Sequence, residues 1–284
     1  MKRHGNRMAG RLRARVAALL CAALALPLLA GCTAAPKLEA PPAAAAGPET
    51  PGTATPGLEA PGAAAAEPEG GALLAGTVID VSDGSLLLAG EGAYGGLYQV
   101  SLDGVPVEPG GAEALCVGKR AEVTFGGITA ECFPEIPADV TRVRAVDDDL
   151  SPFVLYRQAL FDLMETDEGL NGGARYLGVD LSGAANLTGG EKLALQYLLE
   201  QRYGLSVLPG TFDELCEQGY IDRDALYWED GVLLRIALVE DGTDTFRFDA
   251  EKWRSGLGAI YWTDCTAARG ADGWTYEVGG FAIA

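Results

Sequence analysis

The sequence predicts a multidomain chain: a disordered linker, then a small, closed or partly closed all-β barrel, then an α+β domain. Three observations predict this order. Residues 33–72 are almost entirely Ala, Pro, Gly, Glu and Thr, residues 73–148 hold short β-prone runs divided by glycine turns, and residues 149–284 hold helix-capping patterns followed by alternating strands. The predicted domain boundaries are therefore 73–148 and 149–284.

The chain begins with a segment that has the composition of a signal peptide. Six Lys and Arg residues and no acidic residue precede the apolar run at 16–29, which ends in Leu29-Ala30-Gly31-Cys32. The run is shorter than the ~20 residues that span a bilayer, but it suits a signal-peptide core. Its end resembles the lipobox of bacterial lipoproteins, in which the cysteine is diacylated and the chain is cut just before it.

The lipobox resemblance implies that residues 1–31 are removed and that Cys32 becomes the lipidated, palmitate-bearing first residue. Two acyl chains suffice for stable anchoring. We therefore expect a protein held on the cell membrane through Cys32 and facing the extracytoplasmic side. The alternative is an ordinary secretory signal cut nearby, which would leave Cys32 as a thiol.

Residues 32–72 are predicted to be a disordered tether. They contain too few large apolar residues to offset the entropy lost on ordering. The four residues at 38–41 recur at 58–61, which indicates duplication within a linker and no folded unit. Such a tether would hold the folded domains clear of the membrane.

Charge and histidine content exclude several classes of function. Without residues 1–31 the chain keeps 15 Lys and Arg against 40 Asp and Glu, a net charge of −25. So acidic a surface repels phosphate backbones, and nucleic acid is not an expected partner. The single histidine, His4, lies in the predicted signal peptide, so the mature chain lacks the base of Ser-His-Asp and Cys-His mechanisms. We expect no metal and no cofactor.

The β domain is predicted from short runs separated by turn pairs such as Asp83-Gly84. The runs lie at 74–81, 85–89, 97–102, 120–125, 128–132 and 139–146. Their segments GTV at 76–78, VSDGS at 81–85 and VGKRAEV at 117–123 resemble the OB-like domain of uncharacterised Gram-positive lipoproteins. The resemblance implies an OB-like barrel. Because the basic and aromatic face needed for single-stranded DNA is lacking, a spacer or interaction module is favoured.

The α+β domain is predicted to begin with a helix. Ser151-Pro152 is a typical start, because serine caps the first turn and proline has a helical φ. Apolar residues then repeat at helical spacing as far as Leu163. Two capping boxes, each a Thr followed three residues later by a Glu, predict further helices at 188–203 and from residue 211.

The strands of this domain are predicted from alternation of apolar with polar or small residues. One strand is expected at 176–181, before the capping boxes, and others at 232–238, 246–248 and 274–278. Because the helices come first and most strands afterward, we expect helices packed on an antiparallel sheet.

Four segments of residues 149–284 resemble a domain of uncharacterised Firmicutes lipoproteins that recurs beside regulatory membrane metallopeptidases. They are DLSG at 180–183, TFDEL at 211–215, YWEDG at 227–231 and KWRSGLGA at 252–259. The resemblance implies no known activity, and the chain lacks the His-Glu-x-x-His motif of such peptidases.

Four cysteines lie in the two predicted domains. In an exported chain an even number permits disulfides, and we predict the pairs Cys116 with Cys132 and Cys216 with Cys265. Other connectivities and four free thiols remain as alternatives.

Candidate ligand-binding residues are aromatic. The four tryptophans, Trp228, Trp253, Trp262 and Trp274, all lie in the last third of the chain, and rings on a concave sheet can stack on sugars or peptide side chains. Packing in the core is the alternative. Arg254 is a candidate for holding a ligand carboxylate, the alternative being an ion pair with a structural carboxylate.

Taken together, these features favour a membrane-anchored extracytoplasmic lipoprotein that binds or senses a protein, peptide or wall glycan without catalysis. One alternative is a carboxylate-dependent cell-wall glycan hydrolase, although 40 acidic residues offer many carboxylate pairs and none is specific. The other alternative is a structural partner in an envelope complex.

Overall fold

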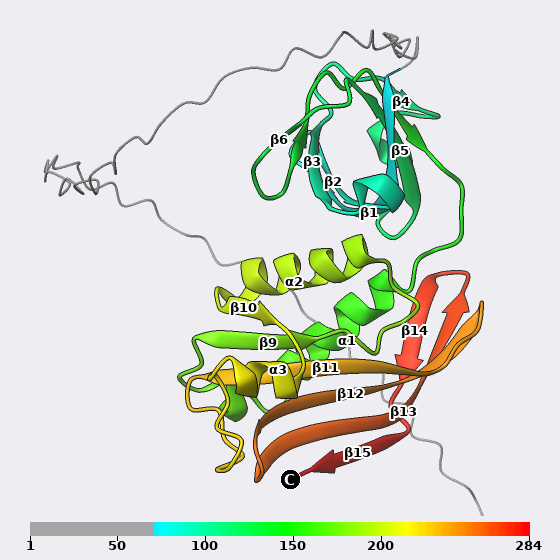
Figure 1. Cartoon of the computed structure of the whole chain (residues 1–284). Helices are drawn as coiled ribbons and strands as arrows, with labels where there is room; N and C mark the ends of the chain where they lie inside the picture. Colours follow the sequence, from blue (N-terminus) through cyan, green and yellow to red (C-terminus); the bar gives the residue numbers. More distant parts are fainter. Residues whose placement is uncertain (1–70) are drawn as a thin grey trace, which may run out of the picture. The chain divides into compact units, whose positions relative to one another are not determined.

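The computed structural model describes residues 71–284, all of which belong to one compact unit. The predicted signal peptide, Cys32 and the predicted tether as far as residue 70 lie outside the described residues. The described part is mostly β-sheet, in several sheets of which none is closed (Figure 1). Between residues 71 and 284, no helix is both long enough and apolar enough to cross a membrane.

The N-terminal sheet has six strands in the order β3-β2-β1-β5-β8-β4. Asp83 and Gly84 both have positive φ and turn β1 back into β2, as the turn pair predicts. All its pairings are antiparallel except β4 with β8. Its elements are β1 (Ala72–Ser82), β2 (Ser85–Gly90), η1 (Gly92–Tyr94), β3 (Leu97–Ser101), β4 (Val107–Glu108), η2 (Ala112–Ala114), β5 (Arg120–Phe125) and β8 (Arg142–Ala145).

This sheet is open, because β3 and β4 stand at its two ends and do not pair with each other. The strand predicted at 128–132 is only two residues long in β6 (Thr129–Ala130), which pairs with β7 (Ile136–Pro137) in a separate two-stranded sheet. Pro134 and Pro137 lie in this segment, and proline has no N–H to donate to a strand ladder. The predicted barrel is therefore not closed.

The large sheet has seven strands in the order β10-β9-β11-β12-β13-β14, with β15 also paired to β13. The prediction of an antiparallel sheet is wrong at one side, since β9 pairs in parallel with both β10 and β11. Helix α2 connects β9 to β10, and such a crossover returns the chain in the same direction. The strands are β9 (Tyr176–Asp180), β10 (Ser206–Pro209), β11 (Gly231–Glu240), β12 (Thr245–Ser255), β13 (Gly258–Gly270), β14 (Gly273–Glu277) and β15 (Gly280–Ile283).

The helices lie on both faces of the large sheet. The main core holds α1 (Phe153–Glu165) and α2 (Gly189–Tyr203) against one face, and a smaller core holds α3 (Phe212–Glu217) against the other (Figure 1). A 3-10 turn, η3 (Glu168–Asn171), follows α1. Both predicted capping boxes are confirmed at the starts of α2 and α3.

Two adjacent glycines at the start of α2 give a testable contrast. A Cβ on Gly190 would lie 2.5 Å from the carbonyl oxygen of Gly90 at the end of β2, whereas a Cβ on Gly189 would meet nothing within 4 Å. We expect Gly190→Ala to lower the free energy of unfolding by about 1–3 kcal/mol through overpacking. Gly189→Ala should leave it unchanged or raise it by up to ~1 kcal/mol, since alanine favours helix. Urea titration of both variants checks this, and equal effects would contradict the packing of α2 on β2.

Candidate functional site

The face of the large sheet that is turned away from α1 and α2 is only partly covered. Helix α3 and the loop after it bury Leu215, Trp228 and Leu233 against one end of this face. Beside them lies a hollow of about 440 Å³, which continues along β11, β12 and β13. We name it the Arg235 groove, lined by Asp180, Ser182, Arg235, Glu251, Trp253 and Tyr261. Its size is in the range of small-ligand sites.

Strand register places four polar side chains in one row across the groove. Asp180 is the Cα partner of Arg235, Arg235 is the partner of Glu251, and Glu251 is the partner of Tyr261. Directly opposite residues in neighbouring strands point to the same face of a sheet. Their neighbours along the strands, such as Leu234 on β11, point into the main core instead. The row is therefore a consequence of the pairing of β9, β11, β12 and β13.

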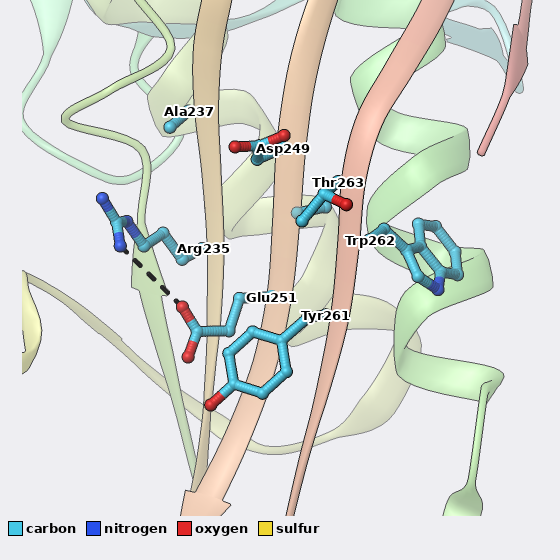
Figure 2. Close-up of a pocket in the computed structure, with 8 residues that line it drawn as sticks. Arg235, Ala237, Asp249, Glu251, Tyr261, Trp262 and Thr263 are labelled. Atoms are coloured by element: carbon cyan, nitrogen blue, oxygen red, sulfur yellow. Dashed lines mark ion pairs between the residues drawn. The ribbon is translucent and has the colours of Figure 1, made fainter. Parts of the chain in front are cut away.

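The charged groups in this row lie close together but do not hydrogen-bond to one another. Arg235 Nε lies 3.7 Å from Asp180 Oδ2, and Arg235 Nη1 lies 3.8 Å from Glu251 Oε2. Both distances exceed hydrogen-bond length. The side chains of Asp180, Glu251 and Arg235 are 8%, 25% and 54% exposed, so the guanidinium reaches outward between two more buried carboxylates. Figure 2 shows Arg235 facing Glu251, with the ring of Tyr261 beside that carboxylate.

Burial shifts the pKa values of two side chains in the groove. Burial raises the pKa of Glu251; Arg235 opposes this shift, and the charge of Asp180 adds to it. Burial also raises the pKa of Tyr261, and the neighbouring Glu251 raises it further. Asp180 is fixed in position because its Oδ1 accepts hydrogen bonds from Ser182 N at 3.0 Å and from Ser182 Oγ at 2.6 Å.

A second hollow adjoins the groove where the parallel strands end. Asp180, Ser182 and Thr211 line both hollows. From here the chain leaves β9 toward α2 on one face and leaves β10 toward α3 on the other. In sheets with parallel strands, ligands bind outside the carboxyl ends of strands at such a divergence. Residues from the segments at 180–183, 211–215 and 252–259, noted for their resemblance, together line the Arg235 groove.

The structure does not bring the four tryptophans to one surface. Trp228 is fully buried under α3, and Trp262 is buried in the main core on the opposite face of the sheet. Trp274 is half-buried and donates its Nε1 hydrogen to Leu150 O at 2.7 Å. Trp253 lines the groove, where it packs edge-on against Phe212, and it is at the same time buried in the small core. The core alternative thus describes all four rings, since Trp274 also packs against the main core.

Arg254 is not paired with a carboxylate among residues 71–284, so the ion-pair alternative considered from the sequence is not formed. Its guanidinium donates to three backbone carbonyls, those of Leu170 at 2.8 Å, Gly172 at 2.6 Å and Glu229. It therefore fastens two loops to β12 and does not face the Arg235 groove. The arginine that faces it is Arg235, which the sequence reasoning did not single out. A signal was present, since Arg235 is the only charged residue within the apolar run at 232–239.

Neither predicted disulfide is formed in the structure, which has Cys116, Cys132, Cys216 and Cys265 as free cysteines. Cys265 is buried in the main core, whereas Cys216 packs against the small core under α3. These two cores lie on opposite faces of the large sheet, so a bond between the two sulfur atoms would have to pass through it. Cys116 and Cys132 are both exposed.

Among residues 71–284, no group of three or more metal-ligating side chains lies together. Comparisons of the chain with protein-family models, with curated proteins and with solved structures found no match.

Proposed function

We propose that this chain is a lipid-anchored extracytoplasmic binding protein that holds a ligand in the Arg235 groove without converting it. The observation that carries the proposal is the row of Asp180, Arg235, Glu251 and Tyr261, whose charged groups approach one another without hydrogen bonding. Polar groups that converge in a concave site beside aromatic rings are typical of ligand binding.

Hydrolysis of a wall glycan is the alternative that the raised pKa of Glu251 favours, because a general acid needs such a shift. The position of Arg235 argues against it. In a glycoside hydrolase the two carboxyl groups flank the scissile bond. Here the guanidinium of Arg235 contacts both Asp180 and Glu251 and would occupy the space of that bond. Binding therefore fits the geometry better than cleavage.

In this proposal Cys32 anchors the protein. The tether and the N-terminal sheet set the position of the groove relative to the membrane. The tether spaces the folded part from the membrane. The N-terminal sheet is an OB-like spacer, supported by its β1-β2-β3 meander and by the return of β5 to pair with β1. A structural role in an envelope complex would use the same anchor but would not need the groove.

We expect Cys32→Ser to abolish incorporation of labelled palmitate and to leave the protein uncleaved or released into the medium. The reason is that the lipid holds the protein at the membrane, since so acidic a chain is not held there by electrostatic contact. Fatty-acid labelling and membrane fractionation measure both effects, with Cys116→Ser, at an exposed cysteine, as the control. Undiminished label in Cys32→Ser would contradict lipidation at this residue.

Ligand binding in the groove is tested by photo-crosslinking in intact cells that express the full chain. A benzophenone amino acid replaces Thr263, which lines the groove, or Ile128, which is exposed on the N-terminal part. We expect adducts of higher mass from position 263 that are absent from position 128. Equal adducts at both positions, or none at position 263, would contradict the proposal.

A further inference from the structure

The Arg235 groove has an excess of negative charge. Of the residues that line it, Arg235 is the only cation, whereas the carboxylates are Asp180, Asp213, Asp249 and Glu251. Asp213 is neutralised from outside the groove, because its Oδ1 accepts a hydrogen bond from Arg223 at 2.5 Å. Arg235 is therefore left to balance the other three carboxylates. A concave surface with this balance attracts cations and repels anions.

Asp180 keeps one oxygen free for a donor. Its side chain is 8% exposed, and its Oδ1 accepts both hydrogen bonds from Ser182. Oδ2 accepts none from residues 71–284, and its ion-pair partner there is Arg235 Nε at 3.7 Å. Glu251 likewise has only Arg235 within ion-pair distance in this part of the chain, at 3.8 Å. A buried carboxylate without its hydrogen bonds is costly, so a charged donor that enters the groove is stabilised there.

Arg235 is a weakly held partner for these carboxylates. Its guanidinium hydrogen-bonds to neither of them, whereas the guanidinium of Arg144 donates to Glu122 Oε2 at 2.6 and 3.0 Å. A guanidinium is a rigid fork, and its N–H directions are fixed once the side chain is placed. The Arg235 side chain is 54% exposed, so it can turn toward solvent without losing a hydrogen bond to residues 71–284.

We infer that the groove binds a primary ammonium on an aliphatic stem, which competes with Arg235 for Asp180 and Glu251. An ammonium has three donors on a rotatable stem, so it is not limited to the directions of a fork. It can donate to one carboxylate and remain close to the other. This inference rests on the proposed function and names the ligand class of the same site. A free diamine and the lysine side chain of a peptide share this chemistry.

Phe212 and Tyr261 offer apolar surface for the stem. Both rings are partly buried, line the groove and pack against the small core. Figure 2 shows the ring of Tyr261 beside the carboxylate of Glu251. The stems of basic side chains lie along such surfaces while their charged heads reach polar groups, and a cation near a ring gains further attraction. The groove therefore suits an organic cation.

Ligands without a positive charge fit the groove less well. An anion would be attracted by Arg235 alone and repelled by the carboxylates around it. A neutral ligand has no charge with which to displace Arg235 from between Asp180 and Glu251. A bare metal ion needs several oxygen ligands, and among residues 71–284 no three metal-ligating side chains lie together.

The test is isothermal titration calorimetry on the purified full chain in detergent. One arm titrates cadaverine, with pentanediol as its neutral match. The other arm titrates a short alanine peptide with one central lysine, with the Nε-acetylated peptide as its neutral match. We expect at least one amine to bind and neither neutral probe to bind. Binding of cadaverine alone identifies a free diamine as the ligand, and binding of the peptide alone identifies a lysine side chain. If neither amine binds, the inference is overturned.

The sign of the effect at Arg235 is the sharpest part of the test. Arg235→Gln removes the competing cation and should tighten amine binding about fivefold. Glu251→Gln and Asp180→Asn each remove a charged acceptor and should weaken it about tenfold or more. Weaker amine binding by Arg235→Gln would show that Arg235 itself holds the ligand, and would overturn the inference.

The matched controls are Arg202→Gln and Glu165→Gln. Arg202 on α2 and Glu165 on α1 form an ion pair with side chains 47% and 50% exposed, and neither lines the groove. These substitutions change the net charge as Arg235→Gln and Glu251→Gln do. We expect amine binding to change less than about twofold, since salt screens distant charges. Thermal unfolding checks that each variant is folded. Equal effects of the Arg202 and Arg235 substitutions would mean that binding follows only the overall charge, against the inference.

The outcomes separate this inference from the proposed function. If no amine binds but crosslinks from position 263 persist in cells, the ligand is not an ammonium and the groove is still a binding site. If the crosslinked ligand carries no amine, the inference falls and the binding function stands. If no amine binds and position 263 gives no crosslink, both fall.

Discussion

Replacing Lys252 by methionine is expected to lower the free energy of unfolding by about 3 kcal/mol. Lys252 on β12 is fully buried, and its Nζ donates to the carbonyls of Met164 at 2.9 Å, Thr166 at 2.8 Å and Asp167 at 3.1 Å. These carbonyls lie at and just beyond the end of α1, where helical partners run out. A buried acceptor left without its donor costs about 1–3 kcal/mol, and methionine fills the space without supplying a donor.

The measurement is urea unfolding followed by circular dichroism, with Lys119→Met as the control. Lys119 forms an ion pair with the exposed Asp147, and exposed pairs contribute little to stability. A large loss for Lys252→Met beside a small one for Lys119→Met is expected. If the two variants are equally stable, Lys252 does not hold the end of α1.

Lys252 also predicts a pH dependence. Burial lowers its pKa from the ordinary 10.5 to about 8. Between these values the unfolded chain binds the proton more tightly than the folded one, so folding becomes more favourable as pH rises. From pH 7 to pH 9 the wild type should gain about 1 kcal/mol of stability relative to Lys252→Met. A flat difference would show that the three carbonyls keep the ammonium charged.

Local rules predicted the parts of this fold that depend on neighbouring residues. The helix that starts at the capping box of Thr188 and Glu191 runs to Tyr203 as expected, because its start is encoded within four residues. Strand β5 has the predicted limits of 120–125, and its residues alternate between buried and half-buried positions. Such features can be seen without knowing what lies across the sheet.

Features that depend on pairing between distant segments were missed. Parallel pairing of β9 with β11 joins residues 176–180 to 231–235, and nothing within either run specifies its direction. The prediction that the four tryptophan rings share one binding surface failed for a related reason. Alternation along β12 and β13 puts Trp253 and Trp262 on opposite faces of the sheet. The row of the Arg235 groove arises in the same way, from register across four strands.

Glu191→Ala is expected to lower the free energy of unfolding by about 3 kcal/mol, more than the same change in the other capping box. Glu191 is buried, and its Oε2 accepts from Thr188 N at 2.8 Å and from Thr188 Oγ1 at 3.1 Å. Its Oε1 also accepts from Thr77 Oγ1 on β1 at 2.9 Å and from Ser151 Oγ before α1. The substitution removes a helix cap and leaves the buried Thr77 hydroxyl unpaired.

Glu214→Ala is the matched control, because Glu214 caps α3 through the same two contacts to Thr211 but is exposed and reaches no other element. We expect a clearly smaller loss there. A double-mutant cycle isolates the long-range part: Thr77→Val should cost less in the Glu191→Ala background than in the wild type, since the Thr77 hydroxyl then has no acceptor to lose. Additive effects of Thr77→Val and Glu191→Ala, together with equal losses at Glu191 and Glu214, would mean that Glu191 is only a helix cap. Coupling would instead identify it as the residue through which the N-terminal sheet, α1 and α2 are stabilised together.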